Sequence, residues 1–340
     1  MGEKSGPPPS ADVVDRLERG DIEAASAALE ELRMAPPEDR KEAIRSLRRF
    51  TEGEPEVFKA LWSALVPFLT DGERAVRLST AKLFVTVART APEAVLGAVD
   101  PLAARLADDE EFYYVRARSA EALGYLALEA PEEAVSPAVL ADLRIGLEFD
   151  EPEVREQLAK ALAHVALASP DRLRHHVPTL AENLDADGEE IRYHLATALV
   201  AVGCTAPDAV ADAVEELSGR LDDDSAYVRG RAAEALGLVA RGDSTAAIPE
   251  SELAAVSEGD GDGDDESFAA ERAQFALAGV DGAESSDGFA GEIGSVRGIR
   301  EHTDDVLAAM TRTDEAACPQ CGLELPDGGP PMCPDCGAPR

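Results

Sequence analysis

Four cysteines near the C-terminus have the spacing of a metal site. The sequence reads C-P-Q-C-G at 318–322 and C-P-D-C-G at 333–337. Thiolates in two such pairs can complete a tetrahedral site, and the glycine after each pair permits the tight turn beneath the metal. We therefore expect one zinc ion per chain; iron held by four thiolates and two redox-active dithiols are the alternatives. The expected ligands are Cys318, Cys321, Cys333 and Cys336.

This zinc site should be structural. All four ligands would come from the protein, which leaves no open coordination position for catalysis. A segment as small as 318–340 has almost no core, so it should fold only when metal is bound. The cysteine pairs and the connecting GLELPDGGPPM resemble the short zinc-ribbon tails of many prokaryotic proteins.

No other residues form a recognisable catalytic arrangement. Cys204 follows Val202 at the end of an expected helix, a position typical of a buried filler. The sequence contains no G-x-x-x-x-G-K-[ST], G-x-S-x-G or H-E-x-x-H motif. No two histidines have metal-ligand spacing within one helix, which favours surface or groove positions for all of them: His164, His175, His176, His194 and His302.

An acidic glycine-rich stretch at 258–266 partly resembles a calcium-binding loop. Asp260, Asp262 and Asp264 have the D-x-D-x-D spacing, and Glu271 falls at loop position 12. The sharp turn of such a loop requires glycine at position 6, where this chain has Asp265. A solvated acidic loop is therefore the preferred interpretation, with calcium binding as the alternative.

Most of the chain is organised by a repeat of about 40 residues. A β-branched residue followed by arginine occurs five times, at separations of 39, 39, 37 and 37 residues. Alanine follows at offset 5, leucine or phenylalanine at offset 8, and valine or leucine at offset 11, which together fit one face of a helix. Such a period predicts a solenoid. The repeated pairs are Val76-Arg77, Val115-Arg116, Val154-Arg155, Ile191-Arg192 and Val228-Arg229.

A second helix precedes each of these motifs. Leucine pairs spaced by four mark it, from Leu65/Leu69 to Leu217/Leu221, and an acidic turn follows each pair. Proline stands 16 residues after four of the β-branched residues, at Pro92, Pro131, Pro170 and Pro207. The L-x-x-x-L, the V-R or I-R entry and the A-x-x-L resemble HEAT repeats, especially those of phycobilisome-lyase-like HEAT proteins. The resemblance implies an all-α, right-handed α-solenoid of helix pairs, followed by the zinc ribbon.

The repeated arginines have two interpretations. They could form a basic ladder that binds a ligand. In HEAT arrays, however, this arginine typically bonds an acid in a neighbouring inter-helix loop, and acids are abundant in these loops. The structural interpretation is therefore preferred for the whole set, which is Arg77, Arg116, Arg155, Arg192, Arg229 and, in the expected N-terminal cap, Arg40.

The domain organisation follows from these patterns. Beyond the five clear repeats the apolar pattern is weaker, which is typical of terminal repeats with one face in water. We expect a disordered segment at 1–10, capping helices at 11–53, five repeats at 54–242, a degenerate capping repeat with the acidic loop at 243–280, a linker and amphipathic helix at 281–317, and the ribbon at 318–340. The helix, expected at 289–312, should either dock on the solenoid or recruit a partner, and docking is preferred.

Composition restricts the environment and the partners. The 340 residues include 32 Lys+Arg and 68 Asp+Glu, so the formal charge is −36, and aromatic content is 4%. This acidity resembles that of haloarchaeal proteins. No stretch reaches the roughly 18 uncharged residues of a membrane span, and MGEKSGPPPS has no signal-peptide core, so a cytoplasmic protein is expected. Nucleic acid is not the expected partner, because phosphate binding requires clustered lysine and arginine.

The favoured function is a non-enzymatic scaffold that binds another protein on its concave face. Offsets 3 and 6 of the second helices should line that face and hold four basic residues and two acids. A nucleic-acid-associated protein and a lyase-like HEAT protein are the alternatives, and the stripe could simply be a groove that avoids like charges. The candidate partner-binding residues are Lys82, Arg118, Tyr125, Gln157, Lys160, His164, His194 and Arg231.

Overall fold

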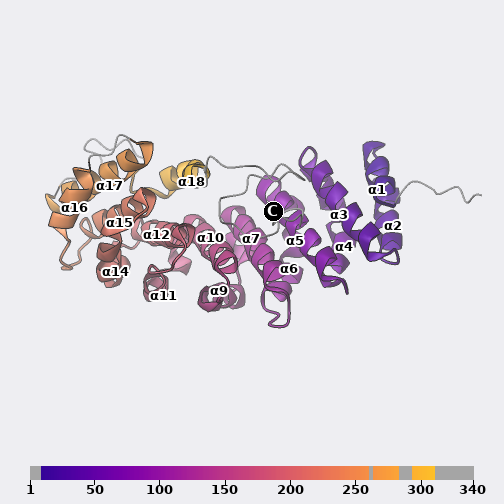
Figure 1. Ribbon diagram of the computed structural model, residues 1–340, viewed down its shortest axis with the longest axis horizontal. Coiled ribbons are helices and arrows are strands. Elements are labelled where there is room, and N and C mark those ends of the chain that lie inside the picture. The colour runs from indigo at the N-terminus through magenta and orange to yellow at the C-terminus, as the bar shows by residue number, and fades with distance from the viewer. Residues whose placement is uncertain (1–8, 260–262, 283–292, 311–340) are drawn as a thin grey trace, which may run out of the picture.

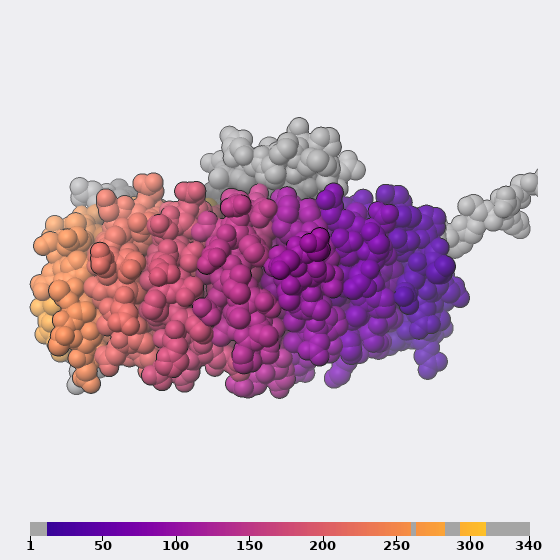
Figure 2. Space-filling model, turned by 90° about the horizontal axis from the view of Figure 1, so that it is seen from below, coloured from indigo at the N-terminus to yellow at the C-terminus, as the bar shows by residue number. Residues whose placement is uncertain are grey.

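The computed structural model describes residues 9–259, 263–282 and 293–310. Every regular element in these ranges is helical. The helices of residues 9–280 stack in chain order along the long axis of an extended molecule, whereas the helix Val296–Met310 lies back over this stack (Figure 1). In the space-filling view the repeats form consecutive bands of colour that abut one another from indigo to orange (Figure 2). The apolar faces of one repeat are therefore covered by its neighbours, as the 40-residue period predicts.

Two layers of helices run along the solenoid (Figure 1). Short A helices form one layer: α4 (Phe58–Leu65), α6 (Val99–Leu106), α9 (Pro137–Ile145), α11 (Val177–Glu182), α14 (Val214–Gly219) and α16 (Glu250–Ser257). Longer B helices form the other: α3 (Pro37–Thr51), α5 (Arg74–Thr90), α7 (Tyr113–Glu129), α10 (Pro152–Ala168), α12 (Glu189–Gly203), α15 (Ala226–Val239) and α17 (Asp264–Val280). At the N-terminal end, α1 (Pro9–Glu18) packs on α3 and α2 (Ile22–Leu32) packs on α4, which extends both layers.

The B helices bury the face that the repeat predicts. In α10, Val154, Ala159, Leu162 and Val165 are all fully buried, and the same offsets are buried in α5, α7, α12 and α15. Consecutive B helices pack directly against one another, as α7 does against α10 and α10 against α12. The predicted pattern of core positions is thus confirmed for all five repeats.

The A helices are shorter than their leucine pairs suggest. Helix α4 ends at Leu65, and a 3₁₀ turn over Val66–Thr70 carries the buried Leu69. Pro67 lies in this turn, where its missing N–H and fixed φ disfavour a continued α-helix. The prolines between repeats begin short helices, such as α8 (Pro131–Ala134) and α13 (Pro207–Val210). Proline is favourable at a first helical position because that N–H has no intrahelical partner.

Three expected boundaries need correction. Helix α1 already begins at Pro9, within the segment expected to be disordered; residues 1–8 lie outside the described part of the chain. Helix α17 begins at Asp264 rather than near Phe268, so the acidic stretch contributes its first turn. Carboxylates are favourable there because they face the positive end of the helix dipole. The amphipathic helix α18 spans Val296–Met310, and Gly294 before it has a φ of 73°.

The metal-type cysteines lie outside the described residues, as do Asp260 and Asp262. Asp264, the third residue of the calcium-like pattern, is part of α17. No helix in the described ranges combines the length and apolar character that a transmembrane span needs.

Candidate interaction surface on the B helices

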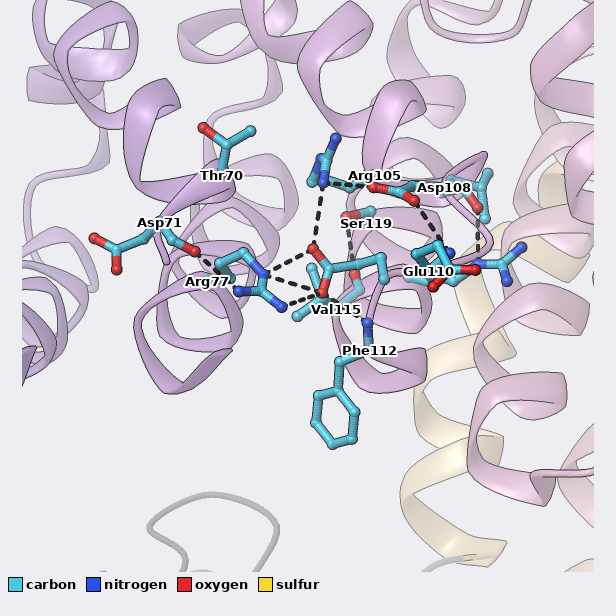
Figure 3. Close-up of polar contacts among 12 residues, drawn as sticks. Thr70, Asp71, Arg77, Arg105, Asp108, Glu110, Phe112, Val115 and Ser119 are labelled. Carbon is cyan, nitrogen blue, oxygen red and sulfur yellow. Dashed lines mark hydrogen bonds and ion pairs between the residues drawn. The ribbon is translucent and has the colours of Figure 1, made fainter. Parts of the chain in front are cut away.

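The repeated arginines connect one repeat to the next. Arg77 in α5 donates hydrogen bonds from Nε and Nη2 to the Glu111 carboxylate, 2.8–3.0 Å away, and from Nη1 to the Asp71 carbonyl oxygen at 2.9 Å. Glu111 belongs to the A–B loop of the following repeat, and its side chain is only 2% exposed. Arg105 approaches the same carboxylate at 3.3 Å (Figure 3). These guanidinium groups are therefore committed to the solenoid itself.

An ion pair of this kind, between a repeated arginine and a carboxylate of the next repeat, recurs in most repeats, and we call it an arginine rung. Four arginines bond a carboxylate of the next repeat, which confirms the structural interpretation for them. Three of these carboxylates lie in the next A–B loop: Arg40 bonds Asp71, Arg77 bonds Glu111 and Arg192 bonds Asp223. Arg229 bonds Glu266 in the first turn of α17. Arg116 instead bonds Leu106 O and Asp109 in its own loop and lies over the Phe149 ring. Arg155 Nε is buried without a hydrogen-bond partner among the described residues.

Helix α18 covers part of the outward side of the B helices, which we call the B-helix face (Figure 1). It contacts α10 and α12. Its first residue, Val296, lies beside Cys204 at the end of α12, whereas Val306 belongs to one buried cluster with Tyr193, near the beginning of α12, and Val228. The two helices are therefore antiparallel. Docking on the solenoid was the preferred expectation, and the structure places α18 there.

A buried charge cluster holds the chain where it enters α18. Glu234 Oε1 accepts a hydrogen bond from the Gly294 N–H at 2.8 Å, and Oε2 contacts Arg231 at 2.7 Å and Arg272 at 3.1 Å. The Glu234 carboxylate is fully buried, which alone would raise its pKa, but Arg231 and Arg272 outweigh burial and lower the pKa. Arg231 also donates to the Tyr193 hydroxyl at 3.2 Å. The cluster thus ties α12, α15, α17 and the α18 entry together.

Four of the eight candidate partner-binding residues are buried. Arg231 is 0% exposed within the charge cluster and His194 is 1% exposed on α12, while Gln157 and His164 are buried on α10. Burial, with a contribution from Lys160, lowers the pKa of His164 to about 3 and that of His194 well below its usual value. These four side chains therefore do not lie in the open groove that the sequence predicts, because each of them is buried.

The other four candidates, Lys82, Arg118, Tyr125 and Lys160, remain half-buried on α5, α7 and α10. Lys160 Nζ donates to the Tyr125 hydroxyl at 2.9 Å and lies 3.4 Å from Glu121, which also pairs with Arg118 at 2.6 Å. The structure thus brings Arg118, Tyr125 and Lys160 into one network across α7 and α10. Much of their positive charge is already balanced by Glu121.

A second carboxyl group near these basic residues, that of Glu156 on α10, has a raised pKa. Burial, reinforced by Glu190 and opposed by Lys160 and Arg118, raises the pKa of Glu156 to about 7. Gln157 Nε2 donates a hydrogen bond to Glu156 at 2.8 Å. At neutral pH this carboxyl group is partly protonated and cancels less of the basic charge than an ordinary glutamate would.

Tyr114 is the residue of this surface that the motif analysis missed. It lies one turn before Arg118 on the same side of α7, and its ring is 4.6 Å from that of Tyr113. The chain has five tyrosines, and all of them are on B helices: Tyr113, Tyr114, Tyr125, Tyr193 and Tyr227. Only 4% of the residues are aromatic, so the gathering of all tyrosines on the B helices was the sequence signal that could have indicated Tyr114 as a surface residue.

Cys204 lacks the setting of a nucleophile. It is half-buried at the end of α12, and burial, assisted by Glu234, raises the pKa of its thiol to about 12. The reactive form of cysteine is the thiolate, which this environment disfavours. Its expected role as an apolar filler agrees with this position.

Comparison with known proteins identifies the architecture. No protein-family model matches the chain, and no curated protein matches it. Among solved structures, an engineered protein covers 64% of this chain and 98% of its own at 24% identity, with a TM-score of 0.57. Computationally designed armadillo repeat proteins for modular peptide recognition cover 62% and 98% at 19% identity, with a TM-score of 0.52. The fold is an armadillo/HEAT-like helical-repeat solenoid.

One solenoid of this type has a bound peptide. A designed armadillo repeat protein in complex with the peptide (KR)4 covers 62% of this chain and 98% of its own at 20% identity, with a TM-score of 0.54. At this identity the likeness shows the fold alone. The helical-repeat class predicted from the 40-residue period is confirmed.

Proposed function

We propose that this solenoid is a non-enzymatic scaffold that binds another protein on the B-helix face of α5, α7 and α10. The observation that carries the proposal is the docking of α18, because it is an amphipathic helix seated on the continuation of this face over α10 and α12. A surface that accepts one such segment of its own chain has the shape to accept one from a partner. Peptide binding by designed relatives of the fold supports the same function.

The residues of this site suggest how a partner would be held. Tyrosine and arginine are the residue types most enriched among binding hot spots, and Tyr114, Arg118 and Tyr125 share one side of α7. Lys160 extends this set onto α10 through its bond with Tyr125. An acidic segment packed on the two tyrosine rings would complement the site. In concentrated salt the rings should contribute most of the affinity, because exposed charge contacts are screened.

A charge and aromatic substitution tests this site. A partner is first isolated by pull-down from the native host at molar salt. The double change Tyr114→Ala with Arg118→Glu should then weaken its binding at least tenfold, measured by calorimetry, because two hot-spot contacts are lost. Arg297→Glu makes the same charge change on the outer side of α18, where the side chain is 87% exposed, and serves as the control. A folded double variant that binds with unchanged affinity would contradict the site.

We further propose that Cys318, Cys321, Cys333 and Cys336 hold a structural zinc ion in a ribbon that accompanies the scaffold. The support is the chemistry of the donor set, since four cysteines in two C-x-x-C pairs suit tetrahedral zinc. In this proposal the ribbon is an accessory module, and the solenoid carries the partner site.

We also propose that the protein works in a salt-rich cytoplasm. Its formal charge of −36 should oppose compact folding when screening is weak. The Debye length grows from about 3 Å at 1 M salt to about 10 Å at 0.1 M, so repulsion then reaches between helices.

The melting temperature should therefore fall when the protein is moved from molar to tenth-molar KCl, as measured by circular dichroism. Sucrose at low salt is the control for non-specific stabilisation, and it should restore less stability than salt does. An equal melting temperature at both salt concentrations would refute the proposed salt adaptation.

A further inference from the structure

The antiparallel arrangement of α18 on α12 gives an approximate register between the two helices. Val296 lies beside Cys204, and Val306 belongs to one buried cluster with Tyr193 and Val228. From Val296 to Val306 the chain advances ten residues along α18, and from Cys204 to Tyr193 it goes back eleven residues along α12. Thr303 is therefore at the level of Thr197, and Val306 is at the level of Tyr193 and His194.

Polar atoms of α10 and α12 are buried on this side without a partner. Gln157 Oε1, His194 Nδ1 and Thr197 Oγ1 have no hydrogen bond among the described residues. All three side chains are more than nine-tenths buried. No described residue of α18 bonds these atoms. Val306 has no polar group, and the proton of the Thr303 hydroxyl goes to the Ile299 carbonyl oxygen at 2.6 Å. Burying polar atoms without partners weakens the contact that buries them.

A buried carboxylate holds the chain just before α18 begins. The Gly294 N–H is fixed by the buried Glu234, before the first helical turn. Within the helix, Ile299 and Val306 are the large apolar side chains that are buried. The ion pair between Arg300 and Glu129 is exposed on both sides, and such pairs contribute little.

We propose that α18 is an exchangeable cover and that the α10–α12 surface beneath it binds an amphipathic helix of a partner protein. The partner helix would place an amide side chain, asparagine or glutamine, opposite His194 and Thr197. An amide can donate and accept at once, which matches an imidazole nitrogen, a hydroxyl and the Gln157 amide oxygen. This inference rests on the proposed scaffold function and adds a second docking place to it, beside the Tyr114–Arg118 site.

Two synthetic peptides test the exchange. Both have the sequence of residues 293–310, and one carries Val306→Asn. The host is the full-length protein with Ile299→Asp, a change that expels its own α18 by burying a charge. Fluorescence anisotropy should show the asparagine peptide binding roughly tenfold more tightly than the unchanged peptide, the factor expected for satisfying a buried polar group. Adding His194→Leu to the host should abolish this preference.

Hydrogen exchange provides a test that needs no destabilised host. Thr197→Val removes an unpartnered hydroxyl with little change in shape, so α18 should dock more firmly and its amides should exchange roughly tenfold more slowly. Thr80→Val is the matched control on α5: Thr80 is equally buried, but its hydroxyl donates to Val76 O at 2.9 Å. This control should leave the exchange of α18 unchanged.

The inference is overturned if the two peptides bind equally, if the unchanged peptide binds more tightly, or if neither binds. It is also overturned if Thr197→Val leaves the exchange of α18 unchanged or makes it faster, as an ordered water bonded to the hydroxyl would predict. None of these measurements involves Tyr114 or Arg118. Failure at α12 is therefore distinguishable from failure of the proposed function.

Discussion

Replacing Glu234 by glutamine is expected to lower the free energy of unfolding of the C-terminal repeats by about 3–5 kcal/mol. Glu234 is fully buried between Arg231 and Arg272, and it also accepts the Gly294 N–H. Glutamine keeps a carbonyl oxygen for Gly294 but has no charge. Two guanidinium groups would then remain in a low-dielectric interior without a counter-ion, which is the most costly way to break a buried ion pair.

The effect should be local, because solenoid repeats contact only their neighbours. Hydrogen exchange should accelerate in α12, α15, α17 and α18, while α3 and α5 stay protected; denaturant unfolding followed by circular dichroism gives the size of the loss. Glu129→Gln is the control, since Glu129 holds α18 through the exposed pair with Arg300 and should change stability by less than about 1 kcal/mol. Similar losses in both variants would show that the charge cluster is not the anchor.

Replacing Cys318 and Cys333 together by serine is expected to reduce the zinc content from one ion per chain to none. Each change removes a thiolate from a different C-x-x-C pair, so neither half of a four-thiolate site remains complete. The ribbon should lose its structure with the metal. The main thermal transition of the solenoid should hardly move, because solenoid repeats contact only their neighbours and we expect the ribbon to be an independent module.

Metal analysis of the reduced, metal-replete protein is the direct measurement. Cys204→Ser is the control, because this cysteine lies at the end of α12 and has no C-x-x-C partner, so the variant should retain its zinc. Absence of zinc from the unmodified protein would refute the zinc site. A large fall of the main transition in the double variant would refute the independence of the ribbon.

The repeat pattern predicted the core of this fold because the buried face of a helix requires apolar residues at regular spacing in the sequence. Positions such as Val154, Ala159 and Leu162 could be assigned without knowing which helix covers them. The first turn of α17 was harder to predict, since Asp264, Asp265 and Glu266 read as loop residues. Their charges favour a helix N-terminus, and Glu266 also pairs with Arg229 of the preceding repeat.

The covering of the B-helix face could not be derived from periodicity. A repeat indicates which side of a helix meets the core, but not which distant segment covers the opposite side. The sequence of α12 nevertheless indicated that its outer side is covered. Where α7 presents Tyr114, Arg118, Glu121 and Tyr125, the matching positions of α12 are Glu190, His194, Thr197 and Ala201. Such a weakly charged outer face is typical of a covered helix.

The arginine rungs bear on how an array of this kind can grow. Arg77 is paired by Glu111 and Arg192 by Asp223, each a carboxylate from the following repeat. A single repeat therefore contains the acid of one arginine rung and the arginine of the next. If one repeat is duplicated or excised, an arginine can be left facing a loop without an acid. The smallest unit that stays self-consistent runs from one B helix through the next A–B loop. Gene rearrangements that preserve this staggered unit would lengthen the solenoid without creating an uncompensated charge.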